Sequence, residues 1–192
     1  MDRLNKQIEF LKEIEKFKSI ERFIYLNSGR RETDPEHSWH MAMFLLVLER
    51  DLPKNLNLTK MLKMALMHDL VEIYSGDVSA FDDIGREGKK TREIESAKKL
   101  FSILPDDLEK EFMQLYIEYI ESKTKEAKFV KSFDKLQPLL QNLTTNGKSW
   151  KEYSISIERL DRLKRSLMTH DKFILELYEV LLNEVKEKKL TI

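Results

Sequence analysis

Apolar residues recur every three or four positions along most of the chain, which is the spacing of one face of an α-helix. This pattern predicts helices over residues 4–17, 93–104, 107–122, 125–143, 154–165 and 172–188. Pro138 falls inside the fourth of these, and a proline removes a helix hydrogen bond, so a kink or break is expected there. We find no internal repeat, low-complexity tract or linker between the segments.

Two further segments are apolar nearly all round and therefore predict central helices. The first should begin with Asp34 as N-cap and Pro35 in the first helical position, and extend to about residue 52. The second, residues 60–74, has Thr59 as a candidate N-cap and ends where Gly76 permits a turn.

Polar stretches separate these helices. After a short periodic piece at residues 20–25, Gly29 and Pro35 mark a loop of about ten residues. Residues 78–92 predict a surface loop that could cover a site, and residues 144–150 predict a turn. Together the pattern predicts an all-α bundle of about eight helices.

Length and composition agree with that fold. A chain of 192 residues suits one domain, so we expect residues 1–192 to form a single unit with its core at about 20–145 and helices 154–188 packed on it. Hydrophobic residues make up 41% of the chain, which has only five Gly and four Pro, as in helical globular proteins.

Charge and cysteine usage exclude several classes of function. Lys plus Arg equals Asp plus Glu at 34 each, so no net field attracts nucleic acid or an anionic membrane. The chain has no cysteine, which excludes disulfides and thiolate metal sites. Its first residues form neither a signal peptide nor a membrane span, so we expect a soluble, cytoplasmic protein.

Polar side chains interrupt the apolar helix at residues 60–74. His68, Asp69 and Glu72 lie three or four positions apart, so they can reach one patch. Burying carboxylates without a partner costs several kcal/mol, and no Lys or Arg occurs between residues 64 and 85. The partner must be a cation or a basic residue from far along the chain.

His37 and Asp134 are polar exceptions of the same kind in two other apolar helices. Two imidazoles and two carboxylates suit Zn, Mn, Fe, Co or Ni better than Ca, because imidazole favours borderline transition ions. Such a set leaves coordination positions open for water.

The segments EHSWHMA, LKMALMHDLVEIYSGDV and EAKFVKSFDKLQPLLQ resemble the HD-domain metal-dependent phosphohydrolases. The similarity is greatest to the branch that contains the bacterial 5'-deoxynucleotidases and small eukaryotic HD-domain proteins, and it covers about residues 22–143. The resemblance implies a divalent cation (Co2+, Mn2+, Zn2+, Fe2+, Ni2+ or Mg2+) and four metal ligands, His37, His68, Asp69 and Asp134.

The resemblance also implies a substrate side to the site. Glu72 and Asp77 would face substrate and the attacking water, and Arg22 would orient the phosphate. The full substrate set is Arg22, Phe23, His37, Asp77, Val78, Ser79 and Ala80. Two departures bear on base or sugar preference: Phe23 follows Arg22 where those nucleotidases have tryptophan, and residues 78–90 lack their proline-rich start.

The implied function is hydrolysis of the phosphate monoester of a (deoxy)nucleoside 5'-monophosphate. A divalent ion would activate water and polarise the phosphoryl oxygen, while Glu72 positions or deprotonates the water, Arg22 neutralises the phosphate and Asp77 holds a sugar hydroxyl. Two alternatives stay open: an HD phosphodiesterase, and a non-catalytic nucleotide- or metal-sensing module. The partner is a small-molecule nucleotide, and generous apolar faces at residues 108–119 and 173–181 suggest a homodimer.

Some polar residues have a competing structural interpretation. Arg22 could form a surface ion pair with Glu21 or Glu15. We interpret His40 as a structural residue near the ligands and His170, in a second His-Asp pair, as a surface helix cap. Arg30 and Arg31 compete with Arg22 as phosphate contacts.

Overall fold

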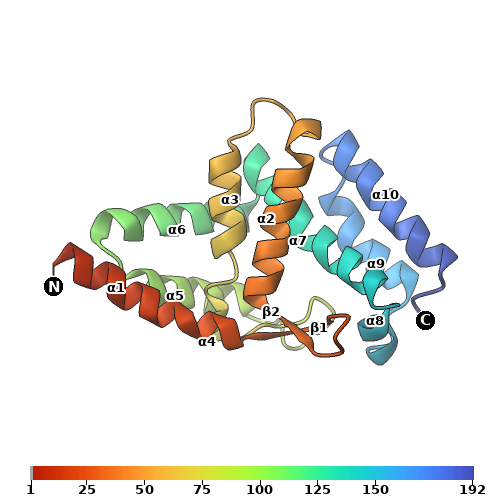
Figure 1. The fold of residues 1–192 in the computed structure, drawn as a ribbon, viewed down its shortest axis with the longest axis horizontal. Coiled ribbons are helices and arrows are strands. Elements are labelled where there is room, and N and C mark those ends of the chain that lie inside the picture. The colour runs from red at the N-terminus through yellow and green to blue at the C-terminus, as the bar shows by residue number, and fades with distance from the viewer. Residues whose placement is uncertain (1) are drawn as a thin grey trace.

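The computed structural model describes residues 2–192, which form a predominantly helical fold with one small antiparallel sheet (Figure 1). The helices are α1 (Arg3–Glu13), α2 (Asp34–Leu48), α3 (Leu58–Met67), α4 (Glu72–Ser75), α5 (Lys89–Phe101), α6 (Asp106–Glu121), α7 (Lys125–Thr144), α8 (Lys148–Glu152), α9 (Ile157–Lys164) and α10 (Lys172–Glu187). Short 3-10 turns follow α1 (Ile14–Ser19), α2 (Glu49–Asp51) and α9 (Arg165–Leu167), and the strands are β1 (Glu21–Tyr25) and β2 (Arg31–Thr33).

Helix α7 is the centre of the fold, because it packs against α2, α3, α6 and α10. Figure 1 shows α2 beside α3 in the middle of the molecule, α1, α5 and α6 on one side, and α8 to α10 on the other. One buried cluster joins α2, α3, α7 and α10, and a second joins α1, α5 and α6 to the residues after α3. None of the helices among the described residues is long and apolar enough to cross a membrane.

The expected loop before α2 is in fact a β-hairpin. Tyr25 pairs with Arg31 and Glu21 with Thr33, and the turn closes through hydrogen bonds between Leu26 and Arg30 and from Gly29 to Leu26. Gly29 has φ +90°, a conformation that side chains disfavour. Residues 26–33 are polar and show no apolar alternation, so the sequence does not predict a strand there. Backbone hydrogen bonds, rather than burial of apolar side chains, stabilise the hairpin.

The predicted start of α2 is off by one residue. Thr33, not Asp34, is the N-cap, and it forms a capping box with Glu36. Asp34 is therefore in the first helical turn, where its carboxylate is free of capping and fully buried. Because it does not cap the helix, the Asp34 carboxylate can instead contact Arg22 in the site described below.

The sequence predicts one continuous helix over residues 60–74, but the structure has two, α3 and α4. The N-cap of α3 is Asn57 rather than Thr59, and α3 ends at Met67. The backbone N–H groups of Leu70, Glu72, Ile73 and Tyr74 each donate three residues back, to the carbonyls of Met67, Asp69, Leu70 and Val71. This tighter winding separates α3 from α4 and turns the His68-Asp69 pair out of the regular helix.

Three other boundaries differ from expectation. Helix α7 is unbroken from Lys125 to Thr144, so no break occurs at Pro138. Residues 144–150 were expected to form only a turn, but α8 begins at Lys148, after Gly147 at φ +68°. Helix α5 starts at Lys89, four residues before the apolar periodicity resumes.

Candidate metal and substrate site

Side chains from α2, the end of α3 and the middle of α7 meet at one point. His37 Nε2 lies 3.4 Å from Asp134 Oδ1 and 3.9 Å from Asp69 Oδ2. His68 Nε2 lies 3.1 Å from Asp69 Oδ2 and 3.9 Å from Asp134 Oδ1. A cation bound at about 2.0–2.2 Å holds its ligand atoms roughly 3–3.5 Å apart, so this spacing fits a divalent ion with little movement.

Hydrogen bonds aim both imidazoles at that point. His37 Nδ1 lies 2.7 Å from Gln137 Oε1, which can only accept, and His68 Nδ1 lies 2.9 Å from the carbonyl oxygen of Ala65. Each Nδ1 therefore carries the proton, and each Nε2 has its lone pair free. Both Nε2 atoms are buried without a hydrogen-bond partner among the described residues, as expected of nitrogens that bind a metal.

Electrostatics around the two imidazoles favours a cation. Burial, helped by the charge of Arg22, lowers the pKa of His37 to about 4 and keeps it neutral. Burial also opposes protonation of His68, but Asp69 outweighs it and raises the pKa of His68. A position where carboxylates attract a proton also attracts a metal ion.

The two carboxylates are held in their ionised form. Asp134 Oδ2 accepts a hydrogen bond from Tyr119 Oη at 2.7 Å and forms an ion pair with Lys135 Nζ at 2.8 Å, while Oδ1 faces the imidazoles. Burial opposes ionisation of both carboxyl groups, yet His68 and Arg22 hold the pKa of Asp69 below its usual range, and Lys135 with the two imidazoles does the same for Asp134. His37, His68 and Asp69 thus form a possible His/Asp metal site, and Asp134 lies against it.

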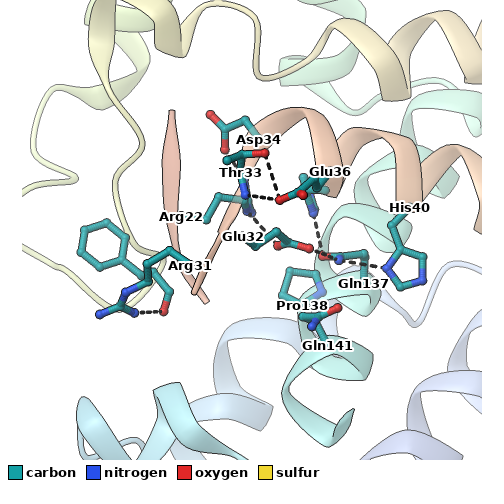
Figure 2. A network of polar contacts seen from close by, with 12 residues as sticks. Arg22, Arg31, Glu32, Thr33, Asp34, Glu36, His40, Gln137, Pro138 and Gln141 are labelled. Atoms are coloured by element: carbon teal, nitrogen blue, oxygen red, sulfur yellow. Dashed lines mark hydrogen bonds and ion pairs between the residues drawn. The ribbon is translucent and has the colours of Figure 1, made fainter. Parts of the chain in front are cut away.

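Arg22 is buried beside this cluster rather than on the surface. Its side chain is 11% exposed, and Nη1 donates to Asp34 at 2.9 Å and to Asp69 at 3.0 Å. Nε lies 3.5 Å from Glu32 (Figure 2). The alternative of a surface ion pair with Glu21 or Glu15 is therefore wrong, because the hairpin turns Arg22 towards buried carboxylates.

A hydrogen-bonded chain behind His37 connects the hairpin to α7. Gln137 Nε2 donates to Glu32 Oε1 at 2.7 Å and lies 3.2 Å from His40 Nδ1, as Figure 2 shows. Gln137 thus fixes His37 with its oxygen and contacts Glu32 and His40 with its nitrogen. His40 belongs to this supporting chain and does not reach the cluster.

Glu72 and Asp77 lie on the cavity side of the cluster. Lys89 Nζ is 2.9 Å from Glu72 Oε1 and 2.8 Å from Glu93, so α5 supplies the distant basic partner. Glu72 Oε2 is buried without a partner in the described part of the chain. Burial, together with the charges of Asp69, Asp77 and Asp34, raises the pKa of Glu72 well above its ordinary value. Burial likewise raises the pKa of Asp77.

A cavity of about 470 Å³ opens over the cluster. All the expected substrate residues line it except His37, which is buried behind, and the lining ones are Arg22, Phe23, Asp77, Val78, Ser79 and Ala80. The sequence did not single out several others, because they come from segments far apart in the chain: Lys89, Lys131, Lys135, Tyr119, Tyr153 and Lys164.

The remaining histidine and arginine candidates lie elsewhere. His170 is not the cap of α10, since Asp171 caps that helix, and its Nε2 contacts Ser132 Oγ at 2.8 Å. Arg30 forms an ion pair with Glu36, and Arg31 binds Glu152 and the Tyr153 hydroxyl. Neither arginine lines the cavity.

Comparison with known proteins gives a consistent picture. The family model described as HD domain matches residues 14–172. Over 136 residues, the chain is 35% identical to the 5'-deoxynucleotidase HDDC2 of Homo sapiens, which covers 70% of this chain and 65% of that protein. The match therefore spans just under two thirds of that relative. The 5'-deoxynucleotidase YBR242W of Saccharomyces cerevisiae is 29% identical over 140 residues, 70% of this chain and 58% of its own.

The fold recurs in solved structures. A protein of Magnetospirillum magnetotacticum, described as a predicted metal-dependent phosphohydrolase, is 34% identical, with a TM-score of 0.91 over 98% of this chain and 95% of its own. PH0347 of Pyrococcus horikoshii is 26% identical, with a TM-score of 0.64 over 94% of this chain and 99% of its own.

Proposed function

Because the chain belongs to the HD-domain family, we propose that it is a metal-dependent hydrolase that releases phosphate from (deoxy)nucleoside 5'-monophosphates. The observation that carries this proposal is the pair of unpartnered Nε2 atoms of His37 and His68, set with Asp69 and Asp134 at the floor of a cavity. The relatives named 5'-deoxynucleotidase supply the substrate class.

His37, His68, Asp69 and Asp134 would hold the ion. When bound there, a divalent cation polarises a phosphoryl oxygen and lowers the pKa of water. The donor set favours Co2+, Mn2+, Zn2+, Fe2+ or Ni2+.

Arg22 orients the phosphate in this proposal. Its Nη1 is held by Asp34 and Asp69, which fixes the guanidinium plane and leaves Nη2 to donate to a phosphate oxygen. Because the side chain is already ordered, substrate binding immobilises little further side-chain freedom.

Glu72 removes the proton from the attacking water. Lys89 on Oε1 holds the carboxyl group in place and leaves Oε2 without a partner among the described residues, so Oε2 is the atom that can accept the proton. Asp77, which follows α4 and lines the cavity, holds a sugar hydroxyl. Phe23, Val78, Ser79 and Ala80 bound the space beside the sugar and base.

Phosphate release is the direct test. The protein is incubated with Mn2+ or Co2+ and a panel of ribo- and deoxynucleoside 5'-monophosphates, with EDTA as control. We expect phosphate release that EDTA abolishes. Hydrolysis of cyclic nucleotides or dinucleotides to nucleoside monophosphates, followed by chromatography, without phosphate release from any monophosphate would establish the phosphodiesterase alternative. Nucleotide binding without hydrolysis of either class would establish the sensing module.

The single domain, the homodimer and the cytoplasmic location are also proposals. The family match over residues 14–172 supports one HD domain through most of the chain. The dimer is proposed from the apolar spacing of residues 108–119 and 173–181, most of whose apolar side chains pack in the core while Val180 is exposed, and sedimentation equilibrium tests it directly.

A further inference from the structure

Lys164, on the last turn of α9, is a buried cation that the proposed reaction does not use. It is 6% exposed, and its Nζ donates to the backbone carbonyl of Lys135 at 2.7 Å. Among the described residues it has no carboxylate within ion-pair distance, although it lines the cavity over the His/Asp cluster.

Two more lysines on α7 join Lys164 on this side of the cavity. Lys131 Nζ lies over the Tyr119 ring, 4.1 Å from its centroid, and Lys135 pairs with Asp134. We call Lys131, Lys135 and Lys164 the lysine wall. Its ion pairs involve the single carboxylate of Asp134, which the metal would also share.

An ammonium group buried without a counter-ion is costly, and proteins usually compensate it with an anion. Burial and the charge of Lys135 lower the pKa of Lys164 to about 7, in keeping with the absence of a carboxylate beside its Nζ in the described part of the chain. Because Lys164 lines the cavity, an anion bound there could supply the counter-charge that the described residues do not place beside its Nζ.

We infer that Lys164, with Lys131, forms an anion subsite that binds phosphoryl oxygens of the ligand in the cavity, apart from the contacts of Arg22. The inference rests on the proposed function in one respect: it assumes that the anion is part of a phosphate compound. The anion has two possible sources, the reacting phosphate itself or a second phosphoryl group on the same ligand.

Binding of inorganic anions to protein in EDTA tests the subsite without any turnover. Orthophosphate and pyrophosphate are titrated into wild type, Lys164→Met and Arg162→Met by calorimetry. Arg162→Met is the matched control, because Arg162 is exposed on the same helix and its substitution also removes one positive charge. Lys131→Met is the second variant, which protects the test should Lys164→Met fold poorly by circular dichroism.

We expect wild type and Arg162→Met to bind orthophosphate alike, and both lysine variants to bind it roughly tenfold or more weakly, as expected for loss of a charge-assisted hydrogen bond. Equal loss for both anions assigns the subsite to the reacting phosphate, and loss for pyrophosphate alone assigns it to a second phosphoryl group. No binding to wild type, or unchanged binding in both lysine variants, overturns the inference. Since no catalysis is measured, these outcomes are independent of whether nucleotides are hydrolysed.

Discussion

The two sides of the cavity differ in sign of charge and in whether each charged side chain has an oppositely charged partner within the protein. On one side, Asp69 and Glu72 line the cavity and Glu32 and Asp34 lie buried beside them; we call these four the carboxylate wall, and each contacts a basic residue of the protein, Arg22 or Lys89. On the lysine wall the cations outnumber the carboxylates. Acids that each contact a basic residue are fixed in position, whereas Lys164, which has no carboxylate beside it among the described residues, is available to an anionic ligand. The two walls should therefore respond differently to mutation.

The largest effect is expected where the walls meet. His68→Ala removes one imidazole from the His/Asp cluster, so we expect metal content to fall from about one ion per chain to none, with loss of turnover. The matched control is His170→Ala, which alters the other His-Asp pair outside the cavity. Metal analysis after dialysis measures both, and retention of the ion by His68→Ala would falsify the ligand assignment.

Glu72→Gln separates catalysis from metal binding on the carboxylate wall. The amide keeps the size of the side chain but cannot take a proton, so we expect kcat to fall about 10²- to 10⁴-fold while metal content is unchanged. Steady-state kinetics with metal analysis on the same sample measures both. Wild-type kcat on every monophosphate would remove Glu72 from the reaction.

Arg22→Met tests whether the carboxylate wall depends on internal pairing. It leaves Glu32, Asp34 and Asp69 without their cation, and removing one partner of a buried ion pair costs about 3–5 kcal/mol. We expect the free energy of unfolding, measured with urea, to fall by about that amount. We also expect steady-state kinetics to show a raised KM. Lys164→Met, its counterpart on the lysine wall, should retain or gain stability, and equal destabilisation by the two substitutions would contradict the difference between the walls.

Gln137→Met removes the group that orients His37 without touching the cluster itself. Loss of such a supporting hydrogen bond typically weakens metal binding about 10- to 100-fold. We expect that loss in a competition titration with a chelator, while Gln141→Met, one turn further along α7, serves as control. Similar weakening by both would mean that the effect is general to α7.

The smallest effect is expected at an exposed pair outside both walls. The bond from Arg30 and the capping contacts at Thr33 lower the pKa of Glu36 to about 2. A carboxylate whose pKa is lowered by folding stabilises the native state above its unfolded pKa of about 4.3, and that contribution disappears as pH falls towards 2. Glu36→Gln should lower Tm by at most about 2–4 °C at pH 6, and the gap should narrow at pH 3. A gap that widens in acid would contradict the assigned shift.

The sequence predicted the predominantly helical fold because apolar spacing is a local signal that burial enforces. Polar residues in apolar helices identified His37, His68, Asp69 and Asp134, and the structure brings them together. The hairpin was not predictable in this way, since residues 26–33 are polar and their hydrogen bonds connect backbone atoms rather than an apolar face. The end of α3 at Met67 was hidden because the apolar spacing continues through the tighter turn.

The supporting residues of the site were missed for a different reason. Gln137 lies 100 residues from His37, and Lys164 lies 29 residues from Lys135, so no short-range pattern connects them. One local signal was available for Gln137: it stands three residues after Asp134, on the same face of α7. For Lys164, nothing in the neighbouring sequence distinguishes a buried ammonium group from the many exposed ones.

Helix α7 contributes both to the core and to the cluster, and this couples ion binding to folding. Asp134 lies between Phe133 and the supporting Gln137, on a helix that contacts α2, α3, α6 and α10. An ion that binds only the native arrangement stabilises the whole protein by mass action, by about 2.7 kcal/mol at a hundredfold excess over its Kd. Supply of the ion would then set the amount of protein that survives proteolysis as well as its rate of turnover.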